Sequence, residues 1–122
     1  MARTIELPTF VDERGSLSVI DGTLPFAIAR VYYIYGCSAA PRGGHRHKKT
    51  RQALVCVSGS CVVDWTNGRE RGSEPLASPG RLLLVEPEDW HVMRDFSEDA
   101  VLLVLASRHF DPDDYIDEGY GS

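Results

Sequence analysis

Short apolar runs separated by turn residues dominate the pattern of hydrophobic and polar positions along this chain. The runs are rich in β-branched, aromatic and leucine side chains, which favour β-strands. Gly, Pro, Ser and Asn punctuate them, and Asn67-Gly68 between two runs is typical of a hairpin turn. The strands that this pattern predicts are 17–20, 27–35, 52–57, 61–65, 81–85 and 100–107.

No segment has the 3.6-residue period of an amphipathic helix. Only residues 111–115 favour a single helical turn, because Asp and Pro suit a helix start. Many short strands at close spacing indicate an antiparallel sandwich or barrel. The length of 122 residues predicts one domain, spanning 1–122, that can bury a core without disulfides or metals.

Charge is distributed unevenly. The formal net charge is −5, yet residues 42–51 contain five of the 13 Lys and Arg and no acid. The other residues therefore hold 8 bases against 18 acids, a formal charge of −10. A basic spot on an acidic protein predicts a small anionic ligand, and it argues against nucleic acid, which requires a broad basic surface.

Three cysteines without CxxC spacing argue against a disulfide framework or a zinc site. The N-terminus has no apolar signal region, and no apolar run approaches the length that crosses a membrane. We therefore expect a cytoplasmic protein with no membrane partner.

Two histidines lie within the basic segment. Residues i and i+2 of an extended strand point to the same face, so His45 and His47 would present two imidazoles side by side. With Gln52 and the distant His91 they have the spacing of a cupin barrel, in which a His-x-His pair and a third histidine share one cavity. Metal-binding cupins normally have Glu at the position of Gln52, and five cations surround the pair, so we predict no metal.

A series of motifs runs in order over nearly the whole chain. They are Phe10-x-Asp12-x-Arg14-Gly15, Pro25-Phe26, 30–34, Arg42-Gly43-x-His45-x-His47-Lys48, Gln52, Gly59, Trp90-His91, and 101–107 with Asp111 and 114–116. With this combination the chain resembles the dTDP-4-oxo-6-deoxyglucose 3,4-ketoisomerases, which belong to the cupin superfamily. Two features depart from the family pattern: Arg46 replaces a small residue, and the tail after Ile116 lacks a basic and aromatic ending.

The resemblance implies an all-β fold, a single cupin (jelly-roll) barrel that forms a homodimer with exchanged N-terminal strands. It implies an isomerase that converts dTDP-4-oxo-6-deoxyglucose to the 3-oxo sugar nucleotide in deoxyaminosugar biosynthesis, without a cofactor. His45 would be the carbon base, assisted by His47 and Tyr33. The implied substrate-binding residues are Arg14 and Arg42 at the pyrophosphate, with Gln52 and His91 in the same cavity.

The residue types suit this chemistry independently of the resemblance. Moving the ketone from C4 to C3 requires removal of the C3 proton, which gives an enediolate, and delivery of a proton to C4. Imidazole titrates near neutrality and can act as both base and acid. A tyrosine hydroxyl can stabilise the developing oxyanion. No redox cofactor is needed, because oxidation at one carbon matches reduction at the next.

Three other functions stay open. A dTDP-sugar 3,5-epimerase would share Arg14 and the barrel, but it typically pairs one histidine with an acid, and residues 42–51 contain none. A metal-dependent cupin enzyme is disfavoured by Gln52. A non-catalytic sugar-nucleotide-binding module would keep the fold and the cavity without the reaction.

Overall fold

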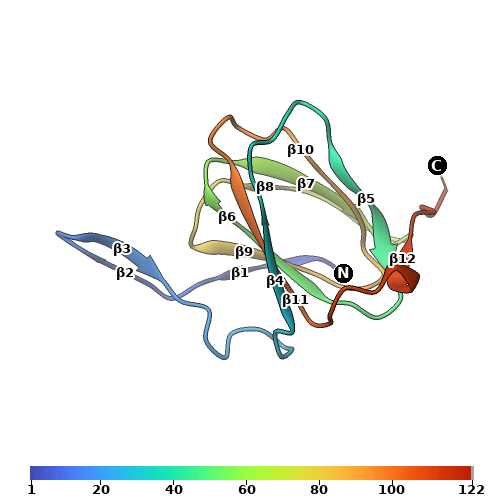
Figure 1. Cartoon of the computed structure of the whole chain (residues 1–122), viewed down its shortest axis with the longest axis horizontal. Helices are drawn as coiled ribbons and strands as arrows, with labels where there is room; N and C mark the ends of the chain where they lie inside the picture. The colour runs from blue at the N-terminus through green and yellow to red at the C-terminus, as the bar shows by residue number, and fades with distance from the viewer. Residues whose placement is uncertain (122) are drawn as a thin grey trace.

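Two five-stranded antiparallel sheets lie face to face in the computed structural model, which describes residues 1–121 (Figure 1). The strand orders are β1-β9-β6-β11-β4 and β12-β5-β10-β7-β8, and β2 pairs only with β3. This is the all-β jelly-roll architecture that the sequence predicts. The elements are β1 (Arg3–Glu6), β2 (Thr9–Asp12), β3 (Gly15–Ser18), β4 (Arg30–Ile34), β5 (Arg42–His47), β6 (Gln52–Ser58), β7 (Cys61–Thr66), β8 (Arg71–Leu76), β9 (Arg81–Val85), β10 (Trp90–Arg94), β11 (Val101–Ala106), the 3₁₀ turn η1 (Pro112–Asp114) and β12 (Tyr115–Ile116).

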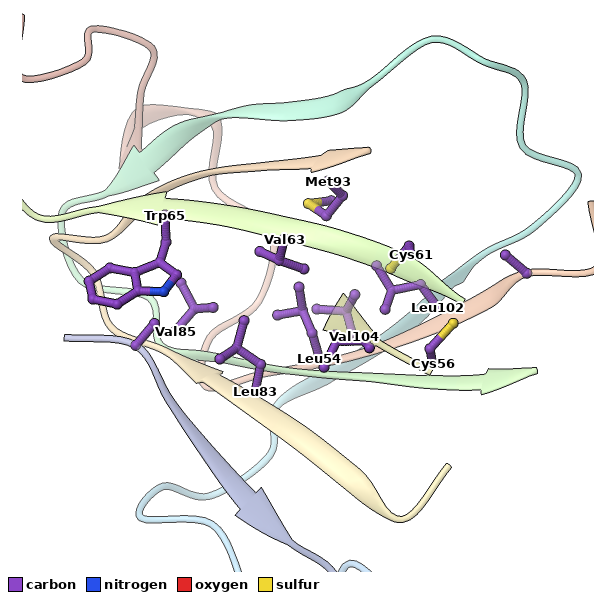
Figure 2. Packing of buried hydrophobic residues seen from close by; sticks show 13 residues of the cluster. Leu54, Cys56, Cys61, Val63, Trp65, Leu83, Val85, Met93, Leu102 and Val104 are labelled. Atoms are coloured by element: carbon purple, nitrogen blue, oxygen red, sulfur yellow. The ribbon is translucent and has the colours of Figure 1, made fainter. Parts of the chain in front are cut away.

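The main core lies between the two sheets. Leu54, Leu83 and Leu102 of the first sheet belong to one buried cluster with Val63 and Met93 of the second (Figure 2). Successive side chains of a strand point to opposite faces, so each strand contributes every second residue to this layer. The interior is therefore apolar over most of its length, and His47 and His91 are buried at the end where β5, β10 and β12 meet.

A second apolar layer covers the outer face of the first sheet. Ala53, Val55 and Leu84 point away from the main core and pack against side chains of the segment that precedes β4, including Leu24 and Phe26. Strands β6 and β9 are thus buried on both faces, which explains why their sequences are almost unbroken apolar runs.

Most of the predicted elements are confirmed. β9 has the predicted bounds, Asn67-Gly68 lies in the connection of the β7–β8 hairpin, and residues 112–114 form the single helical turn. The predicted strand 27–35 is shorter, because only 30–34 pair with β11. The predicted strand 17–20 overlaps β3 only at residues 17 and 18. The apolar runs did not predict β1, β2, β8, β10 or β12, which are short or rich in polar residues, and β8 also contains a proline.

All three cysteines lie among residues 1–121, and none of them is in a disulfide. Within the same residues, no helix is long and apolar enough to cross a bilayer.

Candidate active site

Three histidines come together because β5 and β10 are neighbours in the second sheet. The strands are antiparallel, and His45 lies opposite His91. Alternation along β5 turns His47 to the same side as His45. The close approach of the two strands requires glycine at position 43: Gly43 has a φ of +90°, and a Cβ there would lie 2.9 Å from the carbonyl oxygen of His91.

The imidazoles form a compact cluster against the ring of Tyr115. Ring centroids are 5.2 Å apart for His45 and His47, 5.2 Å for His45 and His91, and 6.2 Å for His47 and His91. The Tyr115 ring lies 4.8 Å from His45 and 4.7 Å from His47, steeply inclined to both. β12 brings Tyr115 to this place, because it pairs with β5 with Tyr115 opposite His47. Edge-to-face contacts of this kind restrict how the rings can turn.

A backbone contact fixes the tautomer of His91. Its Nδ1 lies 3.0 Å from the carbonyl oxygen of Asp89. A carbonyl only accepts hydrogen bonds, so Nδ1 carries the proton and Nε2 of the neutral ring keeps a free lone pair. The buried Asp89 carboxylate accepts a hydrogen bond from the backbone N–H of Glu86 at 2.9 Å, which holds this turn in place.

Burial holds the imidazoles in their neutral form at pH 7. It lowers the pKa of His45, and the negative charge of Asp117 opposes this effect only in part. Burial, followed by repulsion from the other two histidines, lowers the pKa of His47 to about 4. Burial likewise lowers the pKa of His91 to about 4. Both ring nitrogens of His47 are buried without a hydrogen-bond partner among residues 1–121, an unusual state for polar atoms outside a functional site.

A carboxylate fastens the chain next to this cluster. Asp114 accepts hydrogen bonds from the backbone N–H groups of Lys49 at 2.8 Å and Thr50 at 3.3 Å, and from the Thr50 hydroxyl. Burial acts to raise the pKa of Asp114, but these hydrogen bonds and the proximity of His47 outweigh it and lower that pKa. Asp114 is therefore an ionised anchor close to the imidazoles.

A cavity of about 360 Å³ opens beside the histidines. His45 and His91 line it together with two arginines, Arg30 and Arg42. The Arg30 guanidinium lies 5.2 Å from the ring centroid of Tyr32, and its Nε is buried with no hydrogen-bond partner in the described residues. A guanidinium with free donors in a cavity is well suited to phosphate oxygens.

Tyr32 also lines this cavity, and Gln52 holds its hydroxyl. Nε2 of Gln52 donates to the Tyr32 hydroxyl oxygen at 3.0 Å. Because the oxygen already accepts this bond, the hydroxyl proton is free to be donated to a ligand. Burial raises the pKa of Tyr32, which keeps the phenol protonated.

The structure places two of the predicted site residues away from both the cavity and the side chains behind its lining. Alternation on β4 turns Tyr33 to the outer face, where it is 62% exposed, and turns Tyr32 inward. Its position gives Tyr33 no contact with the histidines. Arg14 lies in the β2–β3 hairpin, where it pairs with Asp12 at 2.5 Å and its side chain is 87% exposed. Of the others, His45, His91 and Arg42 line the cavity, while His47 and Gln52 are buried behind its lining.

Sequence reasoning missed Tyr32, Arg30 and Tyr115 as cavity residues. Arg30, Tyr32 and Ile34 share the inward face of β4, but Val31 and Tyr33 on the other face are equally apolar. The sequence therefore carried no signal for which face of this strand points inward. Tyr115 follows the predicted helical turn, and only the pairing of β12 with β5 shows its place.

A wider depression of about 570 Å³ lies over β7, β8 and β10. The carboxylate in its lining is engaged: Arg94 donates to Asp64 at 2.6 Å, and the Ser73 hydroxyl donates to the same carboxylate at 2.5 Å. The cavity beside the histidines, where polar atoms lack partners, is therefore the candidate site. Among residues 1–121 no three His, Cys, Asp or Glu side chains are grouped so as to hold a metal ion.

The fold and site define a jelly-roll protein with neutral imidazoles facing a cationic cavity. Residues 1–120 match the family described as "FdtA: WxcM-like, C-terminal", and the chain belongs to this family. It is 45% identical over 117 residues to the TDP-4-oxo-6-deoxy-alpha-D-glucose-3,4-oxoisomerase of Aneurinibacillus thermoaerophilus, a match that covers 93% of this chain and 84% of that protein.

Solved structures show the same relationship. A mutant of the 3,4-ketoisomerase QdtA from Thermoanaerobacterium thermosaccharolyticum, in complex with TDP-4-keto-6-deoxyglucose, has a TM-score of 0.92 and 38% identity, covering 96% of this chain and 87% of that one. The TDP-quinovose 3,4-ketoisomerase WlaRB from Campylobacter jejuni has a TM-score of 0.91 and 37% identity, covering 96% and 92%.

The buried neutral histidines predict a specific pH dependence of stability. The folded pKa of about 4 for His47 and for His91 lies below the ordinary 6.5, so the unfolded chain binds more protons between these values. The free energy of unfolding should therefore fall as the pH drops from 6.5 toward 4. Urea denaturation at several pH values should show this loss, and His47→Gln should make it shallower. The exposed His109 offers the control: His109→Gln should leave the slope unchanged, and an unchanged slope in His47→Gln would contradict the prediction.

Proposed function

We propose that this chain, acting as one domain, is a sugar-nucleotide 3,4-ketoisomerase that converts TDP-4-oxo-6-deoxyglucose to the 3-oxo isomer. One observation carries the proposal: the neutral imidazoles of His45 and His91 line a cavity that also holds two arginines and a tyrosine hydroxyl, and the unpartnered ring of His47 lies directly beside them. Proton acceptors, anion-binding groups and an oxyanion donor are the parts that the reaction needs. The 45% identical relative carries the name of the same reaction.

His45 is the base that removes the C3 proton. It lines the cavity, its lowered pKa keeps it unprotonated at pH 7, and the edge-to-face contact with Tyr115 holds its ring. Loss of the proton gives an enediolate across C3 and C4. Delivery of a proton to C4, loss of the C3 hydroxyl proton and protonation of the C4 oxygen complete the shift of the ketone. His91, which lines the cavity and presents Nε2, takes the C3 hydroxyl proton, and the proton that His45 gained returns to the sugar. The ring of His47 lies next to that of His45 and assists it from behind the cavity lining.

Tyr32 stabilises the enediolate in place of the predicted Tyr33. Its free hydroxyl proton is donated to the oxygen on which negative charge develops, and Gln52 fixes the direction of that donation. Gln52 acts here as a donor to Tyr32 rather than as a ligand to a cation. The hydrogen bond from Gln52 to Tyr32 supports a reaction that needs no metal. The reaction also needs no redox cofactor, because oxidation at C3 matches reduction at C4.

Arg30 and Arg42 bind the pyrophosphate of the nucleotide. Both line the cavity, and Arg30 has donors without a partner in the described residues. Two guanidinium groups can make paired hydrogen bonds to phosphate oxygens and fix the sugar in front of His45. The free cysteines suit a reducing compartment, so we place the enzyme in the cytoplasm.

The working form is a homodimer in which the β2–β3 hairpin of each copy lies against the other copy. The hairpin projects from the sandwich (Figure 1) and exposes Phe10, Val11 and Leu17, with 64%, 74% and 59% of each residue accessible. A lone two-stranded hairpin is only marginally stable in water. The outer face of β4, an edge strand, is also apolar and exposed at Val31 and Tyr33. β1 pairs with β9 of its own chain, so the hairpin is the segment to exchange, and it would carry Arg14 to the partner's nucleotide.

Proton NMR in deuterated water tests the reaction directly. Chelator-treated protein incubated with TDP-4-oxo-6-deoxyglucose should give a 3-oxo species with exchange confined to C3 and C4. His45→Asn should lower kcat by about 10²- to 10⁴-fold because the carbon base is lost. His109→Asn, at an exposed position, is the matched control. Exchange at C5 would identify an epimerase instead, and bound nucleotide without any exchange would identify a binding module.

The two adjacent tyrosines of β4 test whether the inward hydroxyl takes part in catalysis. Tyr32→Phe removes the proton donated to the enediolate, so kcat should fall by about 10²- to 10³-fold, in the range seen for other oxyanion donors. Tyr33→Phe alters an exposed ring and should leave kcat unchanged. Steady-state assays of both variants measure this. The opposite ranking would show that the inward face of β4 has been assigned to the wrong residues.

Two measurements test the proposed role of the β2–β3 hairpin: the oligomeric state of the protein and its KM for the sugar nucleotide. Sedimentation of the wild-type protein should show a dimer, and Val11→Asp should shift it toward monomer because the apolar contact is lost. Arg14→Ala should keep the dimer but raise KM by about 10- to 100-fold through loss of a charge-assisted hydrogen bond to phosphate. A wild-type monomer with full activity would rule out this arrangement.

A further inference from the structure

The C-terminal residues 111–120, here called the strap, hold β5 from its edge and from both faces. β12, within the strap, pairs with β5 along the edge that would otherwise be free. On the inner face Tyr115 contacts His45 and His47. On the outer face the end of the strap folds back over Arg46, the residue between the two histidines.

Arg46 makes three contacts with the end of the strap. Its Nε donates to the carbonyl oxygen of Glu118 at 3.2 Å, and Nη1 donates to the Tyr120 hydroxyl at 3.2 Å. The guanidinium lies 4.3 Å from the centroid of the Tyr120 ring, within the range of a cation–π interaction. The Tyr120 hydroxyl in turn donates to the carbonyl oxygen of Glu88 at 2.6 Å, which joins the strap to the turn before β10.

Two further features seat the strap on the outer face. The indole Nε1 of Trp90 donates to the carbonyl oxygen of Asp117 at 3.2 Å. Gly68, with a φ of +90°, leaves room for the Tyr120 ring, because a Cβ there would lie 2.8 Å from that ring. The arrangement links the two departures from the family pattern, Arg46 and the tail after Ile116, in one physical contact.

We propose that Arg46 is a positioning residue: by fixing the strap on the outer face of β5, it holds Tyr115 against the imidazoles on the inner face. The inference rests on the proposed ketoisomerase function for its kinetic consequence, but the contact itself exists without it. Arg46 touches neither histidine ring, so its effect on the reaction must pass through the strap and Tyr115.

Loosening the strap would change both the orientation and the hydration of His47. The Tyr115 ring occupies one side of His47, and without it water would reach a ring that is now 3% exposed. The titratable and charged groups that face His47 are His45 on its own strand, His91 on β10, Arg30 on β4, Asp114 in η1 and Tyr115 on β12. Hydration relieves the desolvation that dominates the titration of His47, so its pKa would move upward from about 4 toward 6.5.

The test uses Arg46→Met, which keeps a long apolar stem but has no donor or charge, with Arg69→Met at an exposed turn position as the matched control. Arg46→Met should lower kcat by about 10- to 100-fold with a smaller change in KM, as expected when a reacting group is slightly misplaced. Arg69→Met should match the wild type. NMR titration of the histidine ring protons should show the upward pKa shift of His47 in Arg46→Met and not in the control.

A double variant separates positioning from general stability. If Arg46 acts through Tyr115, the pair Arg46→Met and Tyr115→Leu should have the same kcat as Tyr115→Leu alone. Additive losses, or a wild-type kcat and an unshifted His47 in Arg46→Met, would overturn the proposal. If Arg46→Met does not fold, Tyr120→Ala removes two of the three contacts of Arg46 from the exposed end of the strap and must give the same two effects. If the wild-type protein lacks ketoisomerase activity, the His47 titration alone decides whether the strap holds the cluster.

Discussion

The antiparallel pairing of β5 with β10 on one side and β12 on the other is the constraint on which the site depends. It sets His45 opposite His91 and Tyr115 opposite His47. No single strand could assemble the cluster, because His91 and Tyr115 lie far along the chain from His45 and His47. The backbone hydrogen bonds of the sheet therefore position the imidazoles and Tyr115 beside the cavity.

Burial then gives these side chains their chemical state. Burial lowers the pKa of all three imidazoles at the end of the apolar core, and the positive charge of Arg30 lowers the pKa of His47 slightly further. The cavity is thus cationic and yet contains proton acceptors, a combination that suits removal of a proton from an anionic substrate. Asp114 supplies a negative charge near this cationic cavity. Its ionised carboxylate lies near His47 but accepts hydrogen bonds from backbone and hydroxyl donors. The negative charge therefore lies near the cluster, while the imidazoles stay available to the substrate.

The sequence predicted the fold class and the pair His45 and His47 because both depend on local signals. Apolar runs and turn residues locate β3, β4, β6, β7, β9 and β11, and the His45-x-His47 spacing places two imidazoles on one face. The place of His91 beside them followed from the spacing typical of a cupin barrel. What the sequence could not predict depends on tertiary contacts. Tyr32 and Tyr33 differ only in which face of β4 meets the core, and the two faces are about equally apolar. Arg14 lies in a hairpin that makes no contact with the cavity in the single chain, and Arg46 gains its role only where the tail folds back over β5.

The alternation of β5 has a consequence for how this chain can vary in evolution. At its C-terminal end, beyond the shift of register at Gly43, the inward His45 and His47 carry the proposed chemistry and the outward Arg46 holds the strap, so these residues are separated only by the parity of their positions. Substitutions at single positions leave that parity intact. An insertion or deletion of one residue between Gly43 and His47 would exchange the faces, sending arginine into the cluster and the histidines to the surface. Descendants of this sequence are therefore freer to change length in surface turns than in β5, where the end that carries the histidines must keep its length.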